Sequence, residues 1–362
     1  MKMKKTAVHK NIPYSSAKQV TAIDLFCGCG AMSEGFKRAG FKIAAAVDNN
    51  ETACNTYRKN HPDVLVKEAD ITTIGPDSLI DLTCCNVDVM IVCAPCQPFS
   101  SQNRHRAKDK RSVLIFEAVR FAERLNPSLV VFENVSGLVT EFGLPILNKL
   151  QSGLTSLGYV LGDPQTVDAA DYLVPQRRKR CIMFASKIGI LPKLFPTVCY
   201  KNKHKMVKDA ISDLKPLKSG QIVSNDVLHF ARNHSSVALS RMKHIPKNGG
   251  SRFSLPPELE LACHKGKKND FPDVYGRMRW DDVAPTLTTG CTDITRGRFM
   301  HPRDDRAITL REAARLQTFP DHYQFAGSSS DIAMQIGNAV PVLLAEAIAH
   351  AALTALQKKQ KE

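Results

Sequence analysis

The chain contains 362 residues, of which 43% are hydrophobic, and it carries a formal net charge of +15 at pH 7. This length is sufficient for two domains with sizeable cores. No uninterrupted apolar run approaches the roughly 18 residues of a membrane span, and no apolar segment follows the lysine-rich start as in a secretory signal. We therefore expect a cytoplasmic protein without membrane contact. The 11 cysteines are odd in number and irregularly spaced, which favours free thiols over a disulfide framework.

The first 180 residues alternate strand and helix patterns. Strands are predicted at 20–26, 41–48, 64–70, 87–93 and 128–133, with helices between the first three at about 33–39 and 51–60. Such alternation predicts an α/β fold with a doubly wound, mostly parallel sheet. The alanine- and leucine-rich residues 340–356 predict one further helix.

The basic excess is concentrated after this α/β part. Residues 181–275 hold 16 lysines and arginines against 7 acidic residues, a net charge of +9, whereas residues 61–180 hold 13 and 14. From about residue 190 the chain is rich in Lys, Pro, Asn and Ser and weakly periodic, which predicts a smaller, irregular domain. The charge alone fits a solvated lysine-rich surface as well as a surface that binds nucleic acid. Other signals are needed to favour nucleic acid as the partner.

Acidic residues end the second and third predicted strands, beside a glycine loop after the first. The first strand runs into a loop containing Gly28 and Gly30, whose glycines allow a ligand to approach the backbone. Asp48 ends the second strand, where a carboxylate suits the hydroxyls of an adenosine ribose. Asp70 ends the third strand and can accept a hydrogen bond from an adenine amino group. Turn and helix capping by these acids is the alternative.

A cysteine follows the fourth predicted strand. Cys96 lies on a Pro-Cys step at the carboxyl end of that strand, the edge of an open α/β sheet where ligands bind. A thiolate there can be a nucleophile, and the basic loop that follows favours a phosphate-bearing substrate. Glu133 ends the fifth strand and is expected to share the crevice, as a carboxyl paired with the cysteine. A helix cap is the alternative for Glu133.

Two further patterns accompany these residues. Strand alternation places Arg178 and Arg180 on one face, where two guanidinium groups can hold a carbonyl oxygen and a phosphate; a solvated charge run is the alternative. Cys93 and Cys96 form a C-x-x-C pattern, but the loop continues through Pro98 and no second ligand pair is evident. We therefore favour neither a redox motif nor a metal site.

Taken together, these motifs resemble those of the cytosine-C5 DNA methyltransferases, most closely the prokaryotic enzymes of restriction–modification systems. Six motifs occur in the family's order over nearly the whole chain: Asp24–Gly30, Pro95–Ser100, Phe132–Val135, Gln176 with Arg178 and Arg180, Arg311–Pro320, and Gln335–Pro341. Two positions depart from the usual pattern. Ala31 stands where a glycine commonly ends the cofactor loop, and Asn49 stands where Trp often follows the ribose-binding acid.

The resemblance implies a Rossmann-like methyltransferase that uses S-adenosylmethionine to methylate C5 of a cytosine flipped out of a specific duplex sequence. Cys96 would add covalently to C6, Glu133 would hold N3 and the exocyclic amine, Arg178 would support the O2 carbonyl, and Arg180 would support local structure or a phosphate. The cofactor residues implied are Asp24, Phe26, Gly28, Gly30, Asp48, Asp70, Ile71, Pro95 and Asn338. The DNA-contacting residues implied are Gln97, Ser100, Arg104, Arg106 and Thr286.

The resemblance also implies how the chain is organised. Residues 1–189 with 326–362 would form the catalytic and cofactor-binding domain, and residues 190–325 a target-recognition domain. We expect a monomer that acts on double-stranded DNA, associates with the nucleoid through it, and can accompany a restriction endonuclease encoded nearby without a stable complex.

Three other functions remain as alternatives. An RNA cytosine methyltransferase would use the same chemistry, but the sizeable basic insert favours DNA. A nicotinamide-dependent oxidoreductase would require a third loop glycine, where this chain has Ala31-Met32-Ser33. A catalytically silent DNA-binding module is disfavoured by the presence of Cys96 and Glu133.

Overall fold

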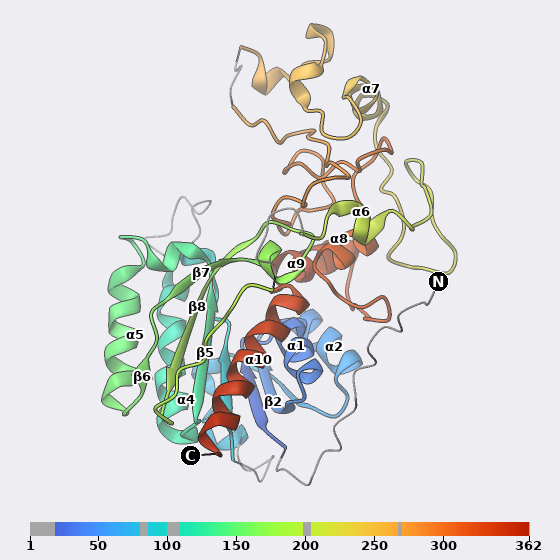
Figure 1. Cartoon of the computed structure of the whole chain (residues 1–362). Coiled ribbons are helices and arrows are strands. Elements are labelled where there is room, and N and C mark those ends of the chain that lie inside the picture. Colours follow the sequence, from blue (N-terminus) through green and yellow to red (C-terminus); the bar gives the residue numbers. More distant parts are fainter. Residues whose placement is uncertain (1–18, 80–85, 100–108, 198–203, 267–269, 362) are drawn as a thin grey trace, which may run out of the picture.

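The computed structural model describes residues 19–79, 86–99, 109–197, 204–266 and 270–361. Within them, an eight-stranded sheet has the order β3-β2-β1-β4-β5-β8-β6, and β7 pairs with β8 (Figure 1). The strands are β1 Thr21–Leu25, β2 Lys42–Asp48, β3 Leu65–Glu68, β4 Val89–Val92, β5 Leu129–Asn134, β6 Val160–Leu161, β7 Gln165–Asp168 and β8 Lys179–Ser186.

The first five strands are parallel, and β8 pairs with β5 in the antiparallel direction. The central strands β1, β4 and β5 are buried along their whole length, because a parallel sheet is covered on both faces and its strands are near-continuous apolar runs. β1 lies between β2 and β4, so the strands that follow it in the chain lie on both of its sides and the strand order changes direction there. Ligands of open α/β sheets bind in the crevice at this point, beyond the carboxyl ends of the strands.

Helices cover both faces of the sheet (Figure 1). One face packs against α1 and α10 around residues such as Phe36 and Ile348, and the other packs against α4 and α5 around Phe121 and Leu150. The helices of the structure are α1 Ala31–Arg38, α2 Glu51–Asn60, α4 Glu117–Leu125, α5 Leu144–Ser156, α6 Val207–Ile211, α7 Ser236–His244, α8 Leu310–Leu316, α9 Ser329–Asn338 and α10 Val342–Lys359. The prediction of a doubly wound, mostly parallel sheet is confirmed.

The C-terminal helix α10 (red in Figure 1) is nearly apolar on all sides. In the part of the chain that the structure describes, the segment Ser329–Lys359 is long and apolar enough to cross a membrane by length and composition, and 67% of its most apolar stretch is buried. Glu346 and His350 interrupt the run. A core helix passes the same test of composition, and α10 packs its buried face on α1 and the sheet.

Residues 204–266 and 270–309 form an irregular region beyond the carboxyl edge of the sheet (Figure 1). They hold the short helices α6 and α7, and isolated bridges replace a sheet. An ion pair between buried residues anchors this region to α8: both carboxylate oxygens of Glu312 accept from Arg306 at 2.8 Å. Glu312 also accepts from the Thr309 amide that begins α8. Arg306 thus links the region to the helix that leads back to the sheet.

Most predicted elements lie within a few residues of the observed ones. The third strand differs in a way that matters for the site, because β3 ends at Glu68 and Asp70 lies beyond it. Asp70 is the N-cap of the 3₁₀ turn Ile71–Thr73, and its Oδ1 accepts from the Thr72 amide at 2.9 Å. At least this oxygen of Asp70 therefore caps a turn, which was the alternative to a role in cofactor binding.

Candidate active site

Four polar side chains lie in a row across adjacent strands at the carboxyl edge of the sheet. Asp24 lies on β1, Cys93 follows β4, Glu133 lies on β5 and Arg180 lies on β8. The pairing of Val92 with Phe132 brings the next residues, Cys93 and Glu133, side by side. Because side chains alternate between the faces of a sheet, all four belong to the face that carries α1 and α10. The row brings together residues that are distant in the sequence.

Glu133 is buried within this row. Its Oε1 lies 2.9 Å from Nε of Arg180, and the Cys93 side chain lies beside its carboxylate. Burial raises the pKa of Glu133 above its usual value, while the positive charges of Arg180 and Arg178 act in the opposite direction. A carboxyl group in this setting can remain protonated closer to neutral pH and can donate a proton.

Cys96 is half-buried on the loop between β4 and the 3₁₀ turn Gln97–Phe99. Burial and the nearby Glu133 raise the pKa of the Cys96 thiol, and Arg180 and Arg178 counteract them. The Asn134 side chain donates to the carbonyl of Ala94 at 3.1 Å, which ties the loop to the end of β5. The thiol is thus held beside the Glu133–Arg180 pair.

A glycine allows the loop after β5 to pack closely on the cysteine loop. A Cβ atom on Gly137 would lie 1.9 Å from the carbonyl oxygen of Phe99. The Phe99 amide in turn donates to the carbonyl of Cys96 at 3.0 Å. Gly137 therefore contributes to the position of the cysteine through close backbone contact.

The predicted alternation around Arg178 is observed: Arg178 and Arg180 are buried, and Arg177 and Lys179 are exposed. The contacts of the two buried arginines differ. Arg178 donates to two backbone carbonyls, those of Leu287 and Gly337, each at 2.8 Å, whereas Arg180 pairs with Glu133. Arg178 therefore joins three distant segments of the chain.

An amide pair reinforces the same junction. Gln176 donates to the side chain of Gln317 at 2.8 Å and accepts from the Leu287 amide at 2.9 Å. Gln317 donates to the carbonyls of Ile336 at 2.5 Å and Ala339 at 3.1 Å. All four side-chain bonds are buried, so the two glutamines connect the segment that precedes β8 with the ends of α8 and α9.

The loop between β1 and α1 has the geometry expected of a ligand cradle. Phe26, Gly28 and Gly30 all have positive φ angles, of 61°, 52° and 92°. A Cβ on Gly28 would meet nothing within 4 Å, so open space adjoins the loop at this position. Asp48 accepts from the Gly28 amide at 2.8 Å and from Asn50 at 2.9 Å. Glycine tolerates this backbone without strain.

Asp24 lies beneath the loop and is fully buried. Its Oδ2 accepts from Ser33 at 2.6 Å, and Ser33 accepts from Tyr57 at 2.6 Å. Its Oδ1 has no partner in the described structure. Burial raises the pKa of Asp24 to about 7. An orphaned buried oxygen beneath a glycine loop fits a polar ligand that completes the site.

The remaining predicted residues are distributed as follows. Ile71 is buried, Pro95 and Gln97 are half-buried beside the cysteine, and Asn338 is exposed at the end of α9. Thr286 is exposed, and its hydroxyl donates to the carbonyl of Arg177 at 2.7 Å. Three DNA-contacting candidates lie outside the described residues: Ser100, Arg104 and Arg106.

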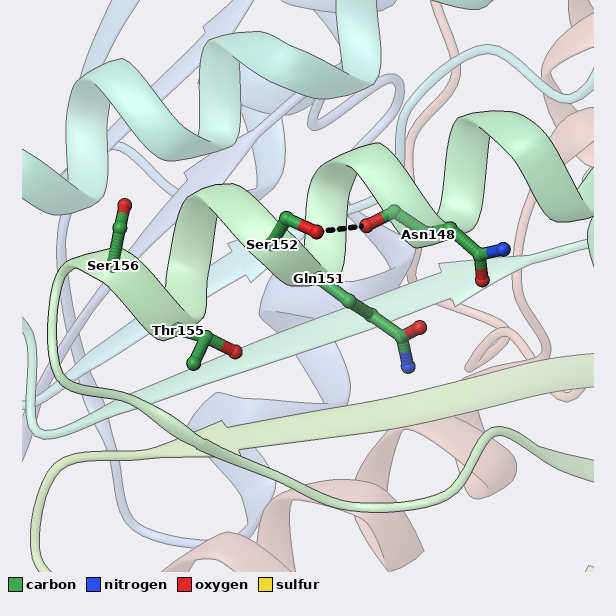
Figure 2. A pocket seen from close by; sticks show the side chains of 5 residues that line it. All are labelled: Asn148, Gln151, Ser152, Thr155 and Ser156. Atoms are coloured by element: carbon green, nitrogen blue, oxygen red, sulfur yellow. Dashed lines mark hydrogen bonds between the residues drawn. The ribbon is translucent and has the colours of Figure 1, made fainter.

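An open polar hollow of about 570 Å³ lies along α5, away from this site. Figure 2 shows its lining, which consists of uncharged side chains from one stripe of the helix: Asn148, Gln151, Ser152, Thr155 and Ser156. The apolar side of α5 packs on the sheet face opposite the polar row. Among the described residues, no group of three or more His, Cys, Asp and Glu side chains is placed to hold a metal ion. The polar row therefore remains the candidate site.

Sequence patterns did not point to several supporting residues. In the sequence Cys93 is only half of a C-x-x-C pattern, and no pattern indicates Tyr323 or His61. The Tyr323 hydroxyl donates to the carbonyl of Cys29, within the β1–α1 loop, at 2.6 Å. The two residues are 294 positions apart, so no local spacing could reveal the contact.

The order of the sheet and the glycine cradle at its switch point define a doubly wound α/β fold with a ligand site at the carboxyl edge of the strands. In agreement, the fold superimposes on a solved prophage-encoded protein of E. coli with a TM-score of 0.74 at 24% identity, covering 94% of this chain and 100% of that one. The S. pombe Dnmt2 methyltransferase superimposes with a TM-score of 0.62 at 18% identity, covering 95% and 100%.

Residues 20–354 match the family of C-5 cytosine-specific DNA methylases, and the chain belongs to this family. It is 37% identical to the type II methylase M.HgiDII of Herpetosiphon aurantiacus, over 90% of this chain and 93% of that protein. It is 36% identical to the type II methyltransferase M1.HphI of Haemophilus parahaemolyticus, over 92% and 87%. The protein is a DNA (cytosine-5-)-methyltransferase of restriction–modification type, and its methyl donor is S-adenosylmethionine.

Proposed function

We propose that the protein methylates a cytosine flipped out of a specific duplex sequence, through a covalent bond between Cys96 and C6, as the modification enzyme of a restriction–modification system. The observation that carries this proposal is the convergence of Cys96, Glu133 and Arg180 at the carboxyl edge of the sheet. Their spacing in the sequence is large, and their chemistry is that of a nucleophile, a proton donor and a cation.

The reaction begins at Cys96. Its thiolate forms a bond to C6, and the C5–C6 double-bond electrons shift into the ring, which makes C5 nucleophilic. Glu133 donates a proton to N3 as negative charge develops there, and its raised pKa suits this role. C5 then forms a bond to the methyl group of the donor, whose C–S bond breaks. The C5 proton passes to water, the C6–S bond breaks as the C5–C6 double bond re-forms, and the N3 proton returns to Glu133, so that Cys96 leaves as a thiolate.

The contacts of Arg178 and Arg180 favour the opposite assignment of roles from the one that the resemblance implies. Arg180 orients Glu133 through the 2.9 Å ion pair and lies beside the ring-binding groups, so we assign to it the support of the cytosine O2 carbonyl. The guanidinium of Arg178 is engaged by two backbone carbonyls. We assign to Arg178 the joining of the segments around the site, with its charge favouring the Cys96 thiolate.

S-adenosylmethionine supplies the electrophilic methyl group. We propose that the cradle beyond β1 holds it: Asp48 would bind the ribose, Phe26 would pack on the adenine, and the glycine loop with Asp24 would complete the pocket. The orphaned Oδ1 of Asp24 and the open space at Gly28 support this placement. The other residues proposed to contact the cofactor are Asp70, Ile71, Pro95 and Asn338.

DNA would bind across the carboxyl edge, between this site and the irregular region. We propose residues 1–189 with 326–362 as the catalytic domain and residues 190–325 as the target-recognition domain, whose basic surface would contact phosphates and base edges. Gln97, Ser100, Arg104, Arg106 and Thr286 would contact DNA beside the extruded base. The protein would act as a cytoplasmic, nucleoid-associated monomer, beside an endonuclease with which it forms no stable complex.

Covalent trapping tests the proposal. Bisulfite sequencing of DNA from cells that express the protein identifies the methylated site. In a duplex that carries 5-fluorocytosine at this site, the fluorine on C5 cannot leave as a proton, so the bond between Cys96 and C6 persists. We expect a denaturation-resistant protein–DNA complex in the presence of S-adenosylmethionine, absent with Cys96→Ala. If the wild-type protein methylates DNA but never forms this complex, the covalent route is wrong.

A further inference from the structure

Tyr323 reaches the proposed cofactor loop from a distant part of the chain. It lies between α8 and α9, its side chain is buried, and its hydroxyl donates to the carbonyl of Cys29 at 2.6 Å. Cys29 stands between the two loop glycines, Gly28 and Gly30. The hydrogen bond therefore acts directly on the peptide units of the cradle.

His61 holds this hydroxyl from the other side. Its Nε2 lies 3.3 Å from the Tyr323 oxygen. Because the hydroxyl gives its single proton to Cys29, Nε2 must carry the proton that it donates to Tyr323. Burial lowers the pKa of His61 to about 4, so the ring is neutral at physiological pH. The result is a directed chain from His61 through Tyr323 to Cys29.

The loop also rests on these side chains by direct contact. A Cβ atom on Gly30 would lie 2.9 Å from Nε2 of His61, from the Tyr323 oxygen and from a ring carbon of Tyr57. The three side chains thus form a floor beneath the loop. With the φ angle of +92° at Gly30, this close approach requires glycine.

The position of the Tyr323 hydroxyl is set independently of the loop. The next residue, Gln324, exchanges two hydrogen bonds with Asn60 at the end of α2, at 2.7 and 2.9 Å. The Tyr323 ring packs against Phe319 and Phe325, with centroid separations of 4.8 and 5.4 Å. A phenylalanine at position 323 would keep this packing and would lose only the hydroxyl.

We propose that Tyr323 is a positioning residue for the methyl donor: its hydroxyl holds the Cys29 carbonyl and thereby keeps the Gly28–Gly30 cradle in its binding conformation. This inference rests on the proposed location of the cofactor at that loop. Without the hydroxyl, the buried carbonyl loses its donor, and the loop gains conformations that do not bind. Cofactor affinity falls, while the chemistry at Cys96 is preserved.

The test compares Tyr323→Phe with Tyr159→Phe. Tyr159 is an equally buried tyrosine whose hydroxyl donates to a carbonyl, that of Pro127, at 2.8 Å. Pro127 precedes β5, so this bond lies at the amino edge of the sheet, away from the cradle. Calorimetric titration with S-adenosylhomocysteine measures binding without turnover, and thermal unfolding measures the stability that each variant loses.

We expect the dissociation constant of Tyr323→Phe for S-adenosylhomocysteine to rise about tenfold, which is the loss of affinity expected when one good hydrogen bond is removed. Its kcat at saturating S-adenosylmethionine should stay within about twofold of wild type, and Tyr159→Phe should bind normally. Unchanged affinity in Tyr323→Phe, or an equal loss in Tyr159→Phe, overturns the inference. Wild-type affinity for S-adenosylhomocysteine in Asp48→Ala would instead refute the proposed cofactor site, and this inference with it.

Discussion

The Oε1 atom of Glu133 lies 2.9 Å from Nε of Arg180, and both side chains are about nine-tenths buried. β5 supplies the acid and β8 the base, and the antiparallel pairing of these strands brings them together. When one partner of a buried ion pair is removed, the other is left as an uncompensated charge in a poorly solvated site. The pair therefore links the protonation of Glu133 to the cation beside it.

Removal of that cation should change how activity depends on pH. Burial raises the pKa of both Glu133 and Cys96, and the positive charge of Arg180 opposes this rise. Arg180→Gln removes that charge, so both pKa values should increase. Both limbs of the kcat/KM profile should move to higher pH, and kcat should fall by about 10²-fold at neutral pH. The control is Arg177→Gln, an exposed neighbour. A profile that keeps its wild-type limbs would show that Arg180 does not tune these groups.

Cys96→Ala should abolish methyl transfer, with a loss of at least about 10³-fold, because no other group can form the bond to C6. DNA binding should be retained, since the thiol contributes little surface. Methylation is measured with tritiated S-adenosylmethionine and binding by gel shift. Cys263→Ala serves as the control, because Cys263 is an exposed free cysteine. Measurable turnover in Cys96→Ala would be incompatible with the covalent mechanism.

Arg178→Met should destabilise the fold more than it changes the chemistry of a folded enzyme. The substitution removes two buried hydrogen bonds to Leu287 and Gly337 and leaves both carbonyls unpaired. We expect a loss of about 3–5 kcal/mol in the free energy of unfolding, measured by urea denaturation. Arg177→Met, at the exposed adjacent position, should change it by less than about 0.5 kcal/mol. Equal stabilities for the two variants would contradict the joining role of Arg178.

Gly137→Ala should disable the site without a change at any polar residue. The new Cβ would lie 1.9 Å from the Phe99 carbonyl, so the cysteine loop must move. A displacement of about 1 Å can cost 10²-fold in rate, and we expect a kcat loss of that order with little change in the KM for S-adenosylmethionine. Gly75→Ala is the matched control, because nothing lies within 4 Å of its Cβ position. Wild-type kcat in Gly137→Ala would show that the loop tolerates the shift.

His301 should make the protein less stable in mild acid. Burial lowers its pKa from 6.5 to about 4, and its Nδ1 accepts from the Asp304 amide at 2.9 Å. The folded state therefore favours the neutral ring. Its contribution, roughly 3 kcal/mol, is complete above pH 6.5 and is lost as the pH falls towards 4.

The measurement is the free energy of unfolding between pH 7 and 4 for the wild type and for His301→Asn, whose side-chain oxygen can replace Nδ1 but cannot titrate. The difference between the two isolates His301 from Asp24, whose pKa is raised to about 7 and whose contribution is lost as the pH rises. We expect the variant to lose less stability on acidification. Parallel curves would mean that His301 is not held neutral by the fold.

Much of the site could be predicted from local pattern. Cys96 follows one buried apolar strand and Glu133 lies at the end of another, and the alternation of a parallel sheet with helices directs the ends of such strands to one edge. The burial of Arg178 and Arg180, and the exposure of Arg177 and Lys179, also followed from local alternation. These predictions depended on periods of a few residues, which a single sequence displays directly.

The partners of those side chains could not be predicted in the same way. Strand alternation placed Arg178 and Arg180 on one face but could not reveal that the first binds carbonyls of Leu287 and Gly337 while the second pairs with Glu133. Asp70 was predicted at a strand end, whereas β3 stops at Glu68 and Asp70 caps a turn. Such details depend on register and on contacts across the whole chain.

The sequence by itself determined the succession of strands and helices along the chain and the edge of the sheet at which the candidate site lies, because local periodicity and short-range geometry encode them. Its motifs carry the resemblance to the cytosine methyltransferases. Only the tertiary structure decided which buried polar groups satisfy one another. Buried donors and acceptors must find partners wherever the packed chain brings them, and for Tyr323 that partner is the carbonyl of Cys29, 294 residues away.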